Sequence, residues 1–580
     1  MYTSERNTQI LIALLKAHGI RKIVASPGAT NLSFVGSVQQ DGYFEIISSV
    51  DERSAAYIAC GLAAESGETV VLSCTGATAS RNYFSGLTEA YYRKLPILVI
   101  TSSQRSGRIG HNYPQVTDRT NPTEDILKIS VQADIIHDGD KEEEWSVNTK
   151  INNAILELRH RDEGPAHINL ITLYGRPFNV EKLPATRKIE RITYGDRLPI
   201  IKHDRVAIFV GSHKKWSSEL TAAVDEFCLK YNAVVLCDQT SNYRGKYRIL
   251  ANIITNQDEY KSSLRNIDLL IHIGDVSGAY MKVSPKEAWR VDSGGKVVDT
   301  FKVLSNVFEM SEINFFHYYN KIKETAGDDA FYRQWKSEYD RFVSRIPDLP
   351  FSNLWIAQNV SQKLTFDCVL HLGILNTLRS WNYFETCDKA DVYCNTGGFG
   401  IDGCVSSLIG SALANTNKMH LGIVGDLAFF YDMNSLGNRY LGKNVRLLII
   451  NNGRGMEFRN YNHAAAVLGD EADKFVAAAG HFGNKSDNLV KHFAEDLGIG
   501  YLTASNKQEF EQNIDDFLSE NTDQPVIFEV FTRVEDENTA LKMMNTLEKD
   551  TSVSARNSIV KLVGKKRIKS LKKLLGKGEK

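Results

Sequence analysis

The sequence predicts an α/β protein made of three doubly wound domains, each a parallel sheet with helices on both faces. Short apolar β-runs alternate with amphipathic helical stretches along most of the chain, a pattern typical of parallel sheets. The length of 580 residues suits about three domains. Two linker-like stretches, 175–199 and 345–353, divide the pattern into three.

The first predicted domain covers residues 1–185, the second 200–345 and the third 355–550. The N-terminal stretch starts polar and continues as an amphipathic helix. Strands are expected at KIVAS, TVVLSCTG, PILVITSS and AHINLIT in the first domain, at RVAIFVGS, AVVLCDQT, DLLIHIGDVSG and WRVDSGGKVVD in the second, and at DVYCNTGG, HLGIVGD, VRLLIINNG and PVIFEVFTR in the third.

Several functional classes are disfavoured by what the sequence lacks. It contains neither G-x-G-x-x-G nor G-x-x-x-x-G-K-[ST], the fingerprints of dinucleotide and nucleotide triphosphate binding. No apolar run reaches the ~18–20 residues of a membrane span, and the N-terminus does not resemble a signal peptide. The eight cysteines form no C-x-x-C pair, so we expect no zinc site and no disulfide framework, and a reducing cytoplasm.

The net charge of −1 hides a basic C-terminal tail. Residues 556–580 hold ten Lys or Arg and one acid, which leaves 59 basic and 69 acidic residues in the body. Within 554–580 an apolar stripe faces lysines, and an anionic membrane surface is one expected partner. A solvated tail, or docking onto the acidic body, is the alternative. Nucleic acid is not expected, because the tail has no aromatic residues to stack on bases.

Two strand ends carry the clearest chemical signal. The apolar run before Gly425-Asp426 and the run before Asn451-Asn452-Gly453 each end abruptly. In open α/β sheets, ligands bind at the carboxyl ends of strands. Asp426 and Asn452 would therefore offer a carboxylate and an amide oxygen to Mg²⁺, completed by a backbone carbonyl and phosphate oxygens. Gly425 and Gly453 would let the backbone approach the phosphates; a helix cap and a turn are the structural alternatives.

These motifs resemble those of the thiamine diphosphate (ThDP)-dependent enzymes of the acetolactate synthase and pyruvate decarboxylase type. GDL followed by NNG resembles the family motif, which implies Mg²⁺ bound by Asp426, Asn452 and the Arg454 carbonyl. NTGGFGIDG, residues 395–403, is particularly similar to the MenD-like SEPHCHC synthases, and Ile401 would support the bent cofactor. The resemblance also implies cofactor contacts at Gly28, Gly398, Phe399, Gly425, Leu427, Gly455 and Met456.

The resemblance extends to the N-terminal domain. VDERSAAYIACGLAAESG, residues 50–67, reads as a helix whose Ala55, Ala56, Ala59 and Gly61 permit close packing. Glu52 would hydrogen-bond N1′ of the aminopyrimidine and so activate the cofactor. In the family, Glu52 and Asp426 would serve one site from two subunits, so a homodimer or homotetramer is expected.

The residues expected around the substrate depart from the family pattern. Ala29 stands where pyruvate decarboxylases have an acid, while Thr30 and Thr396 stand where MenD-like enzymes have arginines that grip carboxylates. Asn31 belongs to the same expected substrate loop. Arg379 could restore one carboxylate contact, although a helix arginine is more often a surface pairing residue.

Three further residues are candidates for proton transfer. His111 and Gln115 lie where family members stabilise the reaction intermediate and move protons. Glu457 falls where carboligases have an apolar residue and close to where decarboxylases have a glutamate; it is a proton donor or a first-turn helix charge. The function of the central segment is left undetermined.

The resemblance implies an enzyme that uses ThDP and Mg²⁺ to decarboxylate a 2-oxo acid and transfers the acyl anion equivalent to an acceptor. Two alternatives stay open. The chain could be a decarboxylase that releases an aldehyde, against which the absence of an acid at position 29 argues, or an inactive homologue that serves as a scaffold. The sequence identifies neither the 2-oxo acid nor the acceptor.

Overall fold

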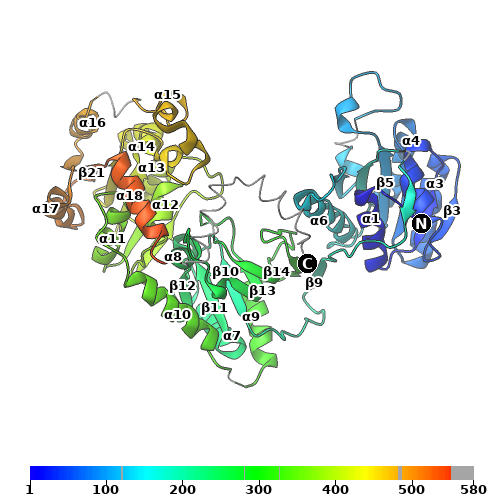
Figure 1. Ribbon diagram of the computed structural model, residues 1–580, viewed down its shortest axis with the longest axis horizontal. Helices are drawn as coiled ribbons and strands as arrows, with labels where there is room; N and C mark the ends of the chain where they lie inside the picture. Colours follow the sequence, from blue (N-terminus) through cyan, green and yellow to red (C-terminus); the bar gives the residue numbers. More distant parts are fainter. Residues whose placement is uncertain (119–121, 175, 280, 326, 481–485, 550–580) are drawn as a thin grey trace, which may run out of the picture. The chain divides into compact units, whose positions relative to one another are not determined.

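The computed structural model describes residues 1–118, 122–174, 176–279, 281–325, 327–480 and 486–549. These residues divide into two compact units, one made of 1–198 with 287–310 and the other of 199–286 with the chain from Ser311 onward. Parallel sheets covered by helices run through both units (Figure 1), so the predicted α/β class is confirmed. The predicted boundaries of three domains stay a prediction.

The main sheet of the first unit has six parallel strands in the order β3-β2-β4-β5-β7-β6. The order reverses between β2 and β4, the place where open α/β sheets leave a crevice for ligands. The strands are β2 (Lys22–Ala25), β3 (Glu45–Ser48), β4 (Val70–Thr75), β5 (Ile97–Ser103), β6 (Ile129–Ala133) and β7 (Ala166–Ile171). A separate two-stranded antiparallel sheet is formed by β1 (Tyr2–Thr3) and β8 (Phe178–Val180).

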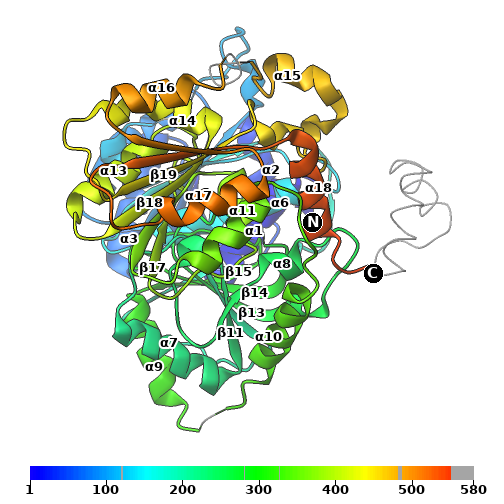
Figure 2. The ribbon, with the colours of Figure 1, turned by 90° about the vertical axis from the view of Figure 1, so that its left-hand side faces the viewer.

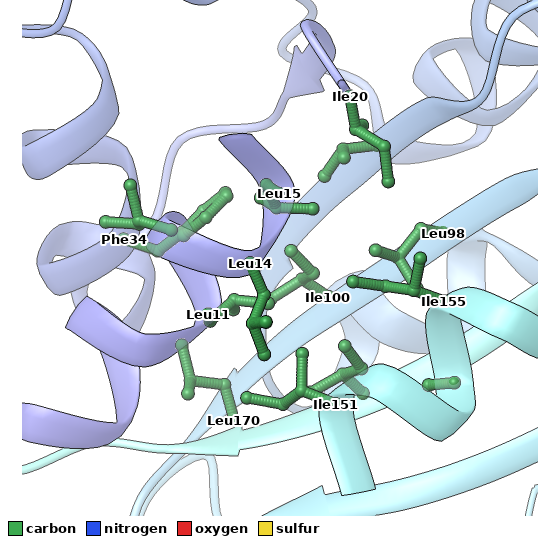
Figure 3. Packing of buried hydrophobic residues seen from close by; sticks show 14 of the residues in the cluster. Leu11, Leu14, Leu15, Ile20, Phe34, Leu98, Ile100, Ile151, Ile155 and Leu170 are labelled. Atoms are coloured by element: carbon green, nitrogen blue, oxygen red, sulfur yellow. The ribbon is translucent and has the colours of Figure 1, made fainter. Parts of the chain in front are cut away.

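Helices bury their apolar faces on both sides of this sheet. On one face, α1 (Arg6–Ala17) and α6 (Lys141–Glu157) pack through Leu11, Leu14 and Ile151 against β5 and β7, as Figure 3 shows. The amphipathic helix predicted at the N-terminus is α1. The other face is covered by α3 (Glu52–Ser66) and α5 (Phe84–Tyr92); α2 (Leu32–Val38) and α4 (Thr78–Asn82) complete this part.

The helix predicted around Glu52 is α3, which begins after the N-cap Asp51 and ends at Gly67 in a left-handed conformation. The small residues of α3 do allow close packing against α5. At Ala56 the two helices are so close that a Cβ added at Gly86 of α5 would lie only 2.4 Å from the Ala56 Cβ. Gly61 has no such neighbour within the chain, where it is exposed with open space beside it, so its part in close packing stays a prediction.

A second group of parallel strands completes the first unit, in the order β14-β15-β9. They are β9 (Glu190–Thr193), β14 (Ser284–Val291) and β15 (Leu304–Glu309). Two predictions need correction here. The stretch 175–199 is not a plain linker, because it supplies β8 and β9, and the strand predicted over 289–299 ends at Val291, where Asp292 and Gly295 form a turn.

In the second unit, four adjacent strands of one sheet have the order β12-β11-β10-β13. An aromatic cluster of Phe227, Tyr231, Phe315 and Tyr319 joins two of its helices. The strands are β10 (Val206–Val210), β11 (Ala233–Cys237), β12 (Arg248–Leu250) and β13 (Asn266–Ile273), and the helices are α7 (Ser218–Tyr231), α8 (Asn252–Thr255), α9 (Glu312–Ile322) and α10 (Ala330–Val343).

The other sheet of the second unit has six parallel strands in the order β17-β16-β18-β19-β21-β20. The order reverses between β16 and β18. The strands are β16 (Cys368–Leu372), β17 (Ala390–Tyr393), β18 (Met419–Gly425), β19 (Val445–Asn451), β20 (Gly500–Ala504) and β21 (Val526–Phe531). Ligands are therefore expected near the loops that follow β16 and β18.

Helices also cover both faces of this sheet (Figure 2). One face carries α13 (Cys404–Ala414), α14 (Asp426–Asp432) and α16 (Leu489–Asp496). The other carries α11 (Asn353–Lys363) and α17 (Lys507–Phe517), joined by contact of Trp355 with Phe510. The last described helix, α18 (Val534–Asn545), packs against α11, while α12 (Asn376–Trp381) and α15 (Ala472–Phe475) are short.

Two expectations about the whole chain can be compared with the described residues. None of the helices in the described ranges is both long and apolar enough to cross a bilayer. All eight cysteines lie in the described ranges and are free. The predicted amphipathic helix of the tail, residues 554–580, lies outside the described residues.

Candidate active site

The two strand ends singled out in the sequence lie next to each other. β18 ends at Gly425 and β19 at Asn451, and the two strands are parallel neighbours with Gly425 opposite Ile450. The predicted placement of Asp426 and Asn452 at neighbouring carboxyl ends is thus confirmed. This edge adjoins the point between β16 and β18 where the strand order reverses.

Asp426 is a buried carboxyl group with only 3% of its surface exposed. Its Oδ1 accepts the backbone N–H of Leu427 at 2.9 Å. Burial raises the pKa of Asp426 to about 7, although backbone N–H groups of Leu427, Gly453 and Arg454 act in the opposite direction. The groups that lower this pKa are backbone N–H groups and not cationic side chains of the described residues, so the carboxyl group needs a positive partner to ionise fully.

Asn452 contributes an oxygen that has no partner. Its Oδ1 is buried and makes no hydrogen bond within the described chain, which is costly for a polar atom. The Arg454 guanidinium is turned away to Asp473, 2.5 Å from its carboxylate. A buried carboxyl group and an unpartnered amide oxygen at one edge fit a hard divalent cation, and Arg454 would contribute its carbonyl.

This donor set would rely on oxygens from outside the chain as well. Among the described residues there is no group of three or more His, Cys, Asp or Glu placed to hold a metal. One carboxylate, one amide and one carbonyl leave positions that phosphate oxygens would complete. The residues present therefore fit a metal bound together with a diphosphate.

A cavity of about 110 Å³ gathers most of the predicted cofactor residues of the second unit. The predicted residues in its wall are Ile401, Gly425, Asp426, Leu427, Asn452, Arg454, Gly455, Met456 and Glu457. Ile401 also packs against the apolar cluster under α13, which suits a supporting role. The predicted Gly398, Phe399 and Thr396 are not in this wall; they belong to the loop between β17 and α13.

Glu457 and Arg379 form an ion pair beside this cavity. Arg379 Nη1 lies 2.5 Å from Glu457 Oε1, and both side chains are largely buried. Asn376 contacts two groups of Glu457 when its amide nitrogen is placed toward the carboxylate. It then donates to Glu457 Oε2 at 2.8 Å, and its oxygen accepts the Glu457 backbone N–H at 3.0 Å. Both partners hold the Glu457 carboxylate in place.

A second, larger cavity of about 440 Å³ shares part of its wall with the first. Asn376, Glu457 and Glu537 line both. Glu537 was not predicted from the sequence. It is buried on α18, where Thr532 Oγ1 and the Asn353 N–H donate to its Oε1 at 2.7 and 3.0 Å, and burial raises its pKa to about 7. The strand-end rule points to this region, since α18 follows β21, but not to Glu537 among the three acids of the first turn.

The predicted residues of the first unit form a separate group. Glu52 is the first residue of α3, is partly exposed, and accepts from Asn82 Nδ2 at 3.3 Å. Gly28 lies in the loop after β2, and a Cβ there would lie 2.5 Å from the Thr75 Cβ, so the loop requires glycine. Ala29 is exposed in the same loop.

Thr30 and Asn31 use their polar atoms inside the first unit. Thr30 Oγ1 contacts Thr75 Oγ1 and donates to the Ser102 carbonyl at 2.9 Å. Asn31 Oδ1 accepts from the hydroxyls of Ser73 at 2.8 Å and Ser102 at 3.1 Å. These bonds fix the loop after β2, and a role toward substrate stays a prediction.

His111 and Gln115 are exposed residues of the segment that follows β5. Gln115 has a positive φ of 61°, a conformation unusual for a residue other than glycine. Their predicted catalytic roles stay predictions.

Comparison with known proteins agrees with this geometry. Residues 6–121 match the family model described as "Thiamine pyrophosphate enzyme, N-terminal TPP binding domain". The 2-succinyl-5-enolpyruvyl-6-hydroxy-3-cyclohexene-1-carboxylate synthase of Bacteroides fragilis is 30% identical over 558 residues, covering 92% of this chain and 97% of the relative. The synthase of the same name from Phocaeicola vulgatus is 29% identical, covering 93% and 98%.

A solved structure was also matched, the Rhodococcus jostii RHA1 thiamine diphosphate-dependent 4-hydroxybenzoylformate decarboxylase. It aligns with a TM-score of 0.40 and 14% identity, covering 91% of this chain and 99% of that chain. That score is too low to support a conclusion about the site. The sequence relatives, which match over nearly their whole length, are decisive: this chain is a thiamine diphosphate-dependent enzyme and belongs to the family of the 2-succinyl-5-enolpyruvyl-6-hydroxy-3-cyclohexene-1-carboxylate synthases.

Proposed function

We propose that this enzyme is a carboligase that uses ThDP and Mg²⁺ to decarboxylate a 2-oxo acid and transfers the acyl group to an acceptor. The observation that carries the proposal is the pair of adjoining cavities. The smaller one holds Asp426 and the unpartnered Asn452 Oδ1, and the larger one gives room for a second reactant beside it. The curated relatives are named as synthases, which agrees with bond formation.

The chain's own residues would hold and orient the reactants. Asp426, Asn452 Oδ1 and the Arg454 carbonyl would bind Mg²⁺, and Gly425, Leu427, Gly455 and Met456 would line the diphosphate end. Ile401 would support the cofactor from the apolar cluster. Bound ThDP supplies the electron sink for loss of CO₂. Glu52 would hydrogen-bond the aminopyrimidine, as the family resemblance implies.

Two acidic residues in the wall that the two cavities share, Glu457 and Glu537, are the candidates for proton transfer. The Glu457 carboxylate is held by Arg379 and Asn376 beside both cavities. Glu537, with a pKa of about 7, can exchange a proton at neutral pH. We propose that Glu537 delivers the proton that the acceptor's carbonyl oxygen takes up when the new bond forms, and that the Glu457 carboxylate helps to position the reactants. Contributions from His111 and Gln115 rest on the family resemblance alone.

The proposed function is tested with a panel of 2-oxo acids, each supplied with and without aldehyde or 2-oxo acceptors. The loaded enzyme is expected to release CO₂ and to form a coupled 2-hydroxy ketone when an acceptor is present. Mass spectrometry and CO₂ release are the two measurements. Release of CO₂ with neither acceptor dependence nor coupled product would overturn the carboligase assignment.

Simple decarboxylation is the second candidate, and the position of Glu457 favours it. A carboxyl group held beside the cofactor cavity could protonate the reacting carbon and release an aldehyde. The same panel separates the two functions, because the aldehyde would then be the only product. An inactive scaffold would yield neither CO₂ nor product with any 2-oxo acid.

Metal binding is expected to depend on pH through Asp426. The pKa of about 7 means that Mg²⁺ must displace a proton at lower pH. Calorimetric titration should therefore show the affinity for Mg²⁺ and ThDP falling about tenfold for each pH unit below about 7. An affinity that does not change between about pH 5.5 and 8 would contradict this assignment.

The Asp426 carboxyl group should also make the stability of the cofactor-free protein depend on pH. Here the sense is opposite to that of metal affinity, because stability falls as the pH rises. Its pKa is higher in the folded than in the unfolded chain, so its contribution to stability is lost as the pH rises from about 4 to about 7. Glu537 adds a contribution of the same sign. Comparing wild type with Asp426→Asn across this range isolates the part that belongs to Asp426.

We also propose a homodimer or homotetramer in the cytoplasm. The support is the resemblance to the family and the absence of disulfides among eight free cysteines. Sedimentation velocity at several protein concentrations tests the oligomer. A monomer that persists with ThDP and Mg²⁺ bound and is fully active would contradict it.

For the tail, we propose weak contact with an anionic membrane surface, supported by ten basic residues over 556–580 and their amphipathic pattern. Full-length protein is expected to sediment with phosphatidylserine vesicles at low salt and to be released at high salt. A chain that ends at residue 553 should stay in the supernatant. Equal sedimentation of both proteins would exclude the tail as an anchor.

A further inference from the structure

His463 is a half-buried side chain in the wall of the larger cavity of the second unit. Its ring contacts Phe458 edge to face, with 5.4 Å between the ring centroids. Phe458 in turn lines the smaller cavity, whose wall includes Asp426 and Asn452. The imidazole therefore lies next to the boundary between the two cavities.

The segment that carries His463 is fixed by hydrogen bonds to other parts of the second unit. The backbone N–H of Tyr461 donates to Asn538 Oδ1 at 2.7 Å, and Asn538 Nδ2 donates to the Arg459 carbonyl at 2.9 Å. The Tyr461 hydroxyl donates to Asp258 Oδ2 at 2.5 Å. A ring on such a segment is held in place before a reaction begins, which is what groups that stabilise a transition state require.

The hydrogen bond made by Nδ1 determines which ring nitrogen carries the proton. His463 caps the 3₁₀ helix Ala464–Glu471, and its Nδ1 accepts the backbone N–H of Ala465 at 3.0 Å. A backbone N–H can only donate, so Nδ1 has a lone pair there, and in the neutral imidazole the proton lies on Nε2. Within the described ranges, Nε2 makes no hydrogen bond of its own. The Nε2–H group is thus left as a donor for a ligand of the cavity.

Formation of the new carbon–carbon bond requires a donor of this kind. The bond between the carboxyl carbon and C2 of the 2-oxo acid breaks, CO₂ leaves, and the electron pair retained at C2 bonds to the acceptor's carbonyl carbon. The carbonyl oxygen gains negative charge until it takes up one proton. A fixed N–H group stabilises that charge without reorganisation, and a neutral imidazole can serve as such an electrophile.

We infer that His463 is a further catalytic residue, whose Nε2–H donates a hydrogen bond to the acceptor's carbonyl oxygen as the new bond forms. The inference rests on the proposed carboligase function and deepens it. His463 polarises the carbonyl group and keeps its own proton, while the proton that the oxygen takes up comes from Glu537. Loss of CO₂ precedes this step and does not involve the imidazole. Removing the ring should therefore slow coupling and leave decarboxylation unchanged.

His463→Asn separates the imidazole from the helix cap. Asparagine is a good N-cap residue, so it keeps a bond to the Ala465 N–H, but it is too short to replace the Nε2–H donor. We expect the melting temperature and the rate of CO₂ release in a single turnover to stay at the wild-type values. The kcat/KM for the acceptor should fall roughly 100-fold or more, mainly through kcat, which is the loss expected for one donor to a developing oxyanion. His463→Ser, a second capping variant, should behave in the same way.

The kinetic experiment uses the full chain loaded with ThDP and Mg²⁺. Pyruvate and 2-oxoglutarate are supplied as 2-oxo acids, and glyoxylate, acetaldehyde and benzaldehyde as acceptors; the pair that the wild type couples fastest is then used for the variants. His492→Asn, at an exposed position of α16 outside the walls of both cavities, is the matched control. It should change neither CO₂ release nor coupling.

A second measurement tests the position of the proton without any cofactor. In protein labelled with ¹⁵N-histidine, the ring signals that are absent from His463→Asn belong to His463. At about pH 8, above the ordinary pKa of imidazole, we expect Nδ1 to show the chemical shift of an unprotonated nitrogen and Nε2 that of an N–H group. The reversed assignment would remove the proposed donor and overturn the inference.

The outcomes separate this inference from the proposed function. If the wild type releases CO₂ and couples no acceptor, the carboligase function fails and the inference falls with it. If the wild type couples and both His463 variants couple at its rate, the inference is overturned while the function stands. An equal fall in CO₂ release and in coupling would overturn it as well. Coupling that is lost only together with thermal stability would show that His463 acts through the cap, which is the remaining contrary result.

Discussion

Replacing Asp426 with alanine is expected to abolish binding of Mg²⁺ and ThDP, with a loss of affinity of roughly a hundredfold or more, because it deletes the single charged metal ligand that the proposed set contains. Only two neutral protein ligands, Asn452 Oδ1 and a backbone carbonyl, would then remain to bind the ion together with the diphosphate. Calorimetric titration with ThDP and Mg²⁺ measures the loss directly. The wild type should also gain thermal stability from the cofactor, and the variant should gain none.

The variant should remain folded, which makes the result interpretable. In the cofactor-free protein Asp426 is buried with a raised pKa, so its removal relieves an unfavourable burial of charge at pH above about 7. Asp496→Ala, exposed at the end of α16, is the matched control and should bind like the wild type. Unchanged affinity in Asp426→Ala would refute the metal assignment.

Replacing Glu52 with glutamine is expected to have a different effect. Exchange of the C2 proton of bound ThDP should slow by roughly 100-fold to 10,000-fold, the range that a positioned acid or base contributes. Affinity for ThDP should stay within a few fold of wild type, because the diphosphate and metal carry most of it. Proton exchange followed by NMR after acid quench, together with calorimetry, gives both quantities.

Glutamine keeps the shape of the side chain and its contact with Asn82, so a folding defect is not expected. Glu65→Gln on the same helix is the control, since Glu65 is exposed. If exchange in Glu52→Gln proceeds at the wild-type rate, another residue activates the cofactor. If ThDP binding is lost instead, Glu52 acts in affinity and not in activation.

The core of the candidate site was predictable because it follows a rule of topology. Asp426 and Asn452 end two long apolar runs, and parallel strands bring such ends to one edge. The same rule applied to β21 points only to the start of α18, whose first turn holds Glu535, Asp536 and Glu537. Glu537 was missed because a glutamate in the first turn of a helix is ordinary in a sequence, and only its burial against Asn353 and Thr532 distinguishes it.

Other features could not be predicted for physical reasons. β8 and β9 are only three and four residues long and carry no apolar run, so the stretch 175–199 resembles a linker. Asparagines read as turn formers in a sequence. Only the fold collects Asn252, Asn376 and Asn545, from distant segments, in the wall of one cavity. The ion pair of Arg379 with Glu457 likewise depends on packing between segments that are far apart in the chain.

The edge between β18 and β19 is proposed to hold a divalent metal with the diphosphate of ThDP. The most direct measurement is a crystal structure of the enzyme with ThDP and Mn²⁺ in place of Mg²⁺, with the metal located by anomalous scattering. We expect an anomalous peak at about 2.1–2.2 Å from Asp426 and Asn452 Oδ1, with the Arg454 carbonyl and diphosphate oxygens completing the shell. A peak elsewhere, with Asn452 Oδ1 still unligated, would contradict it.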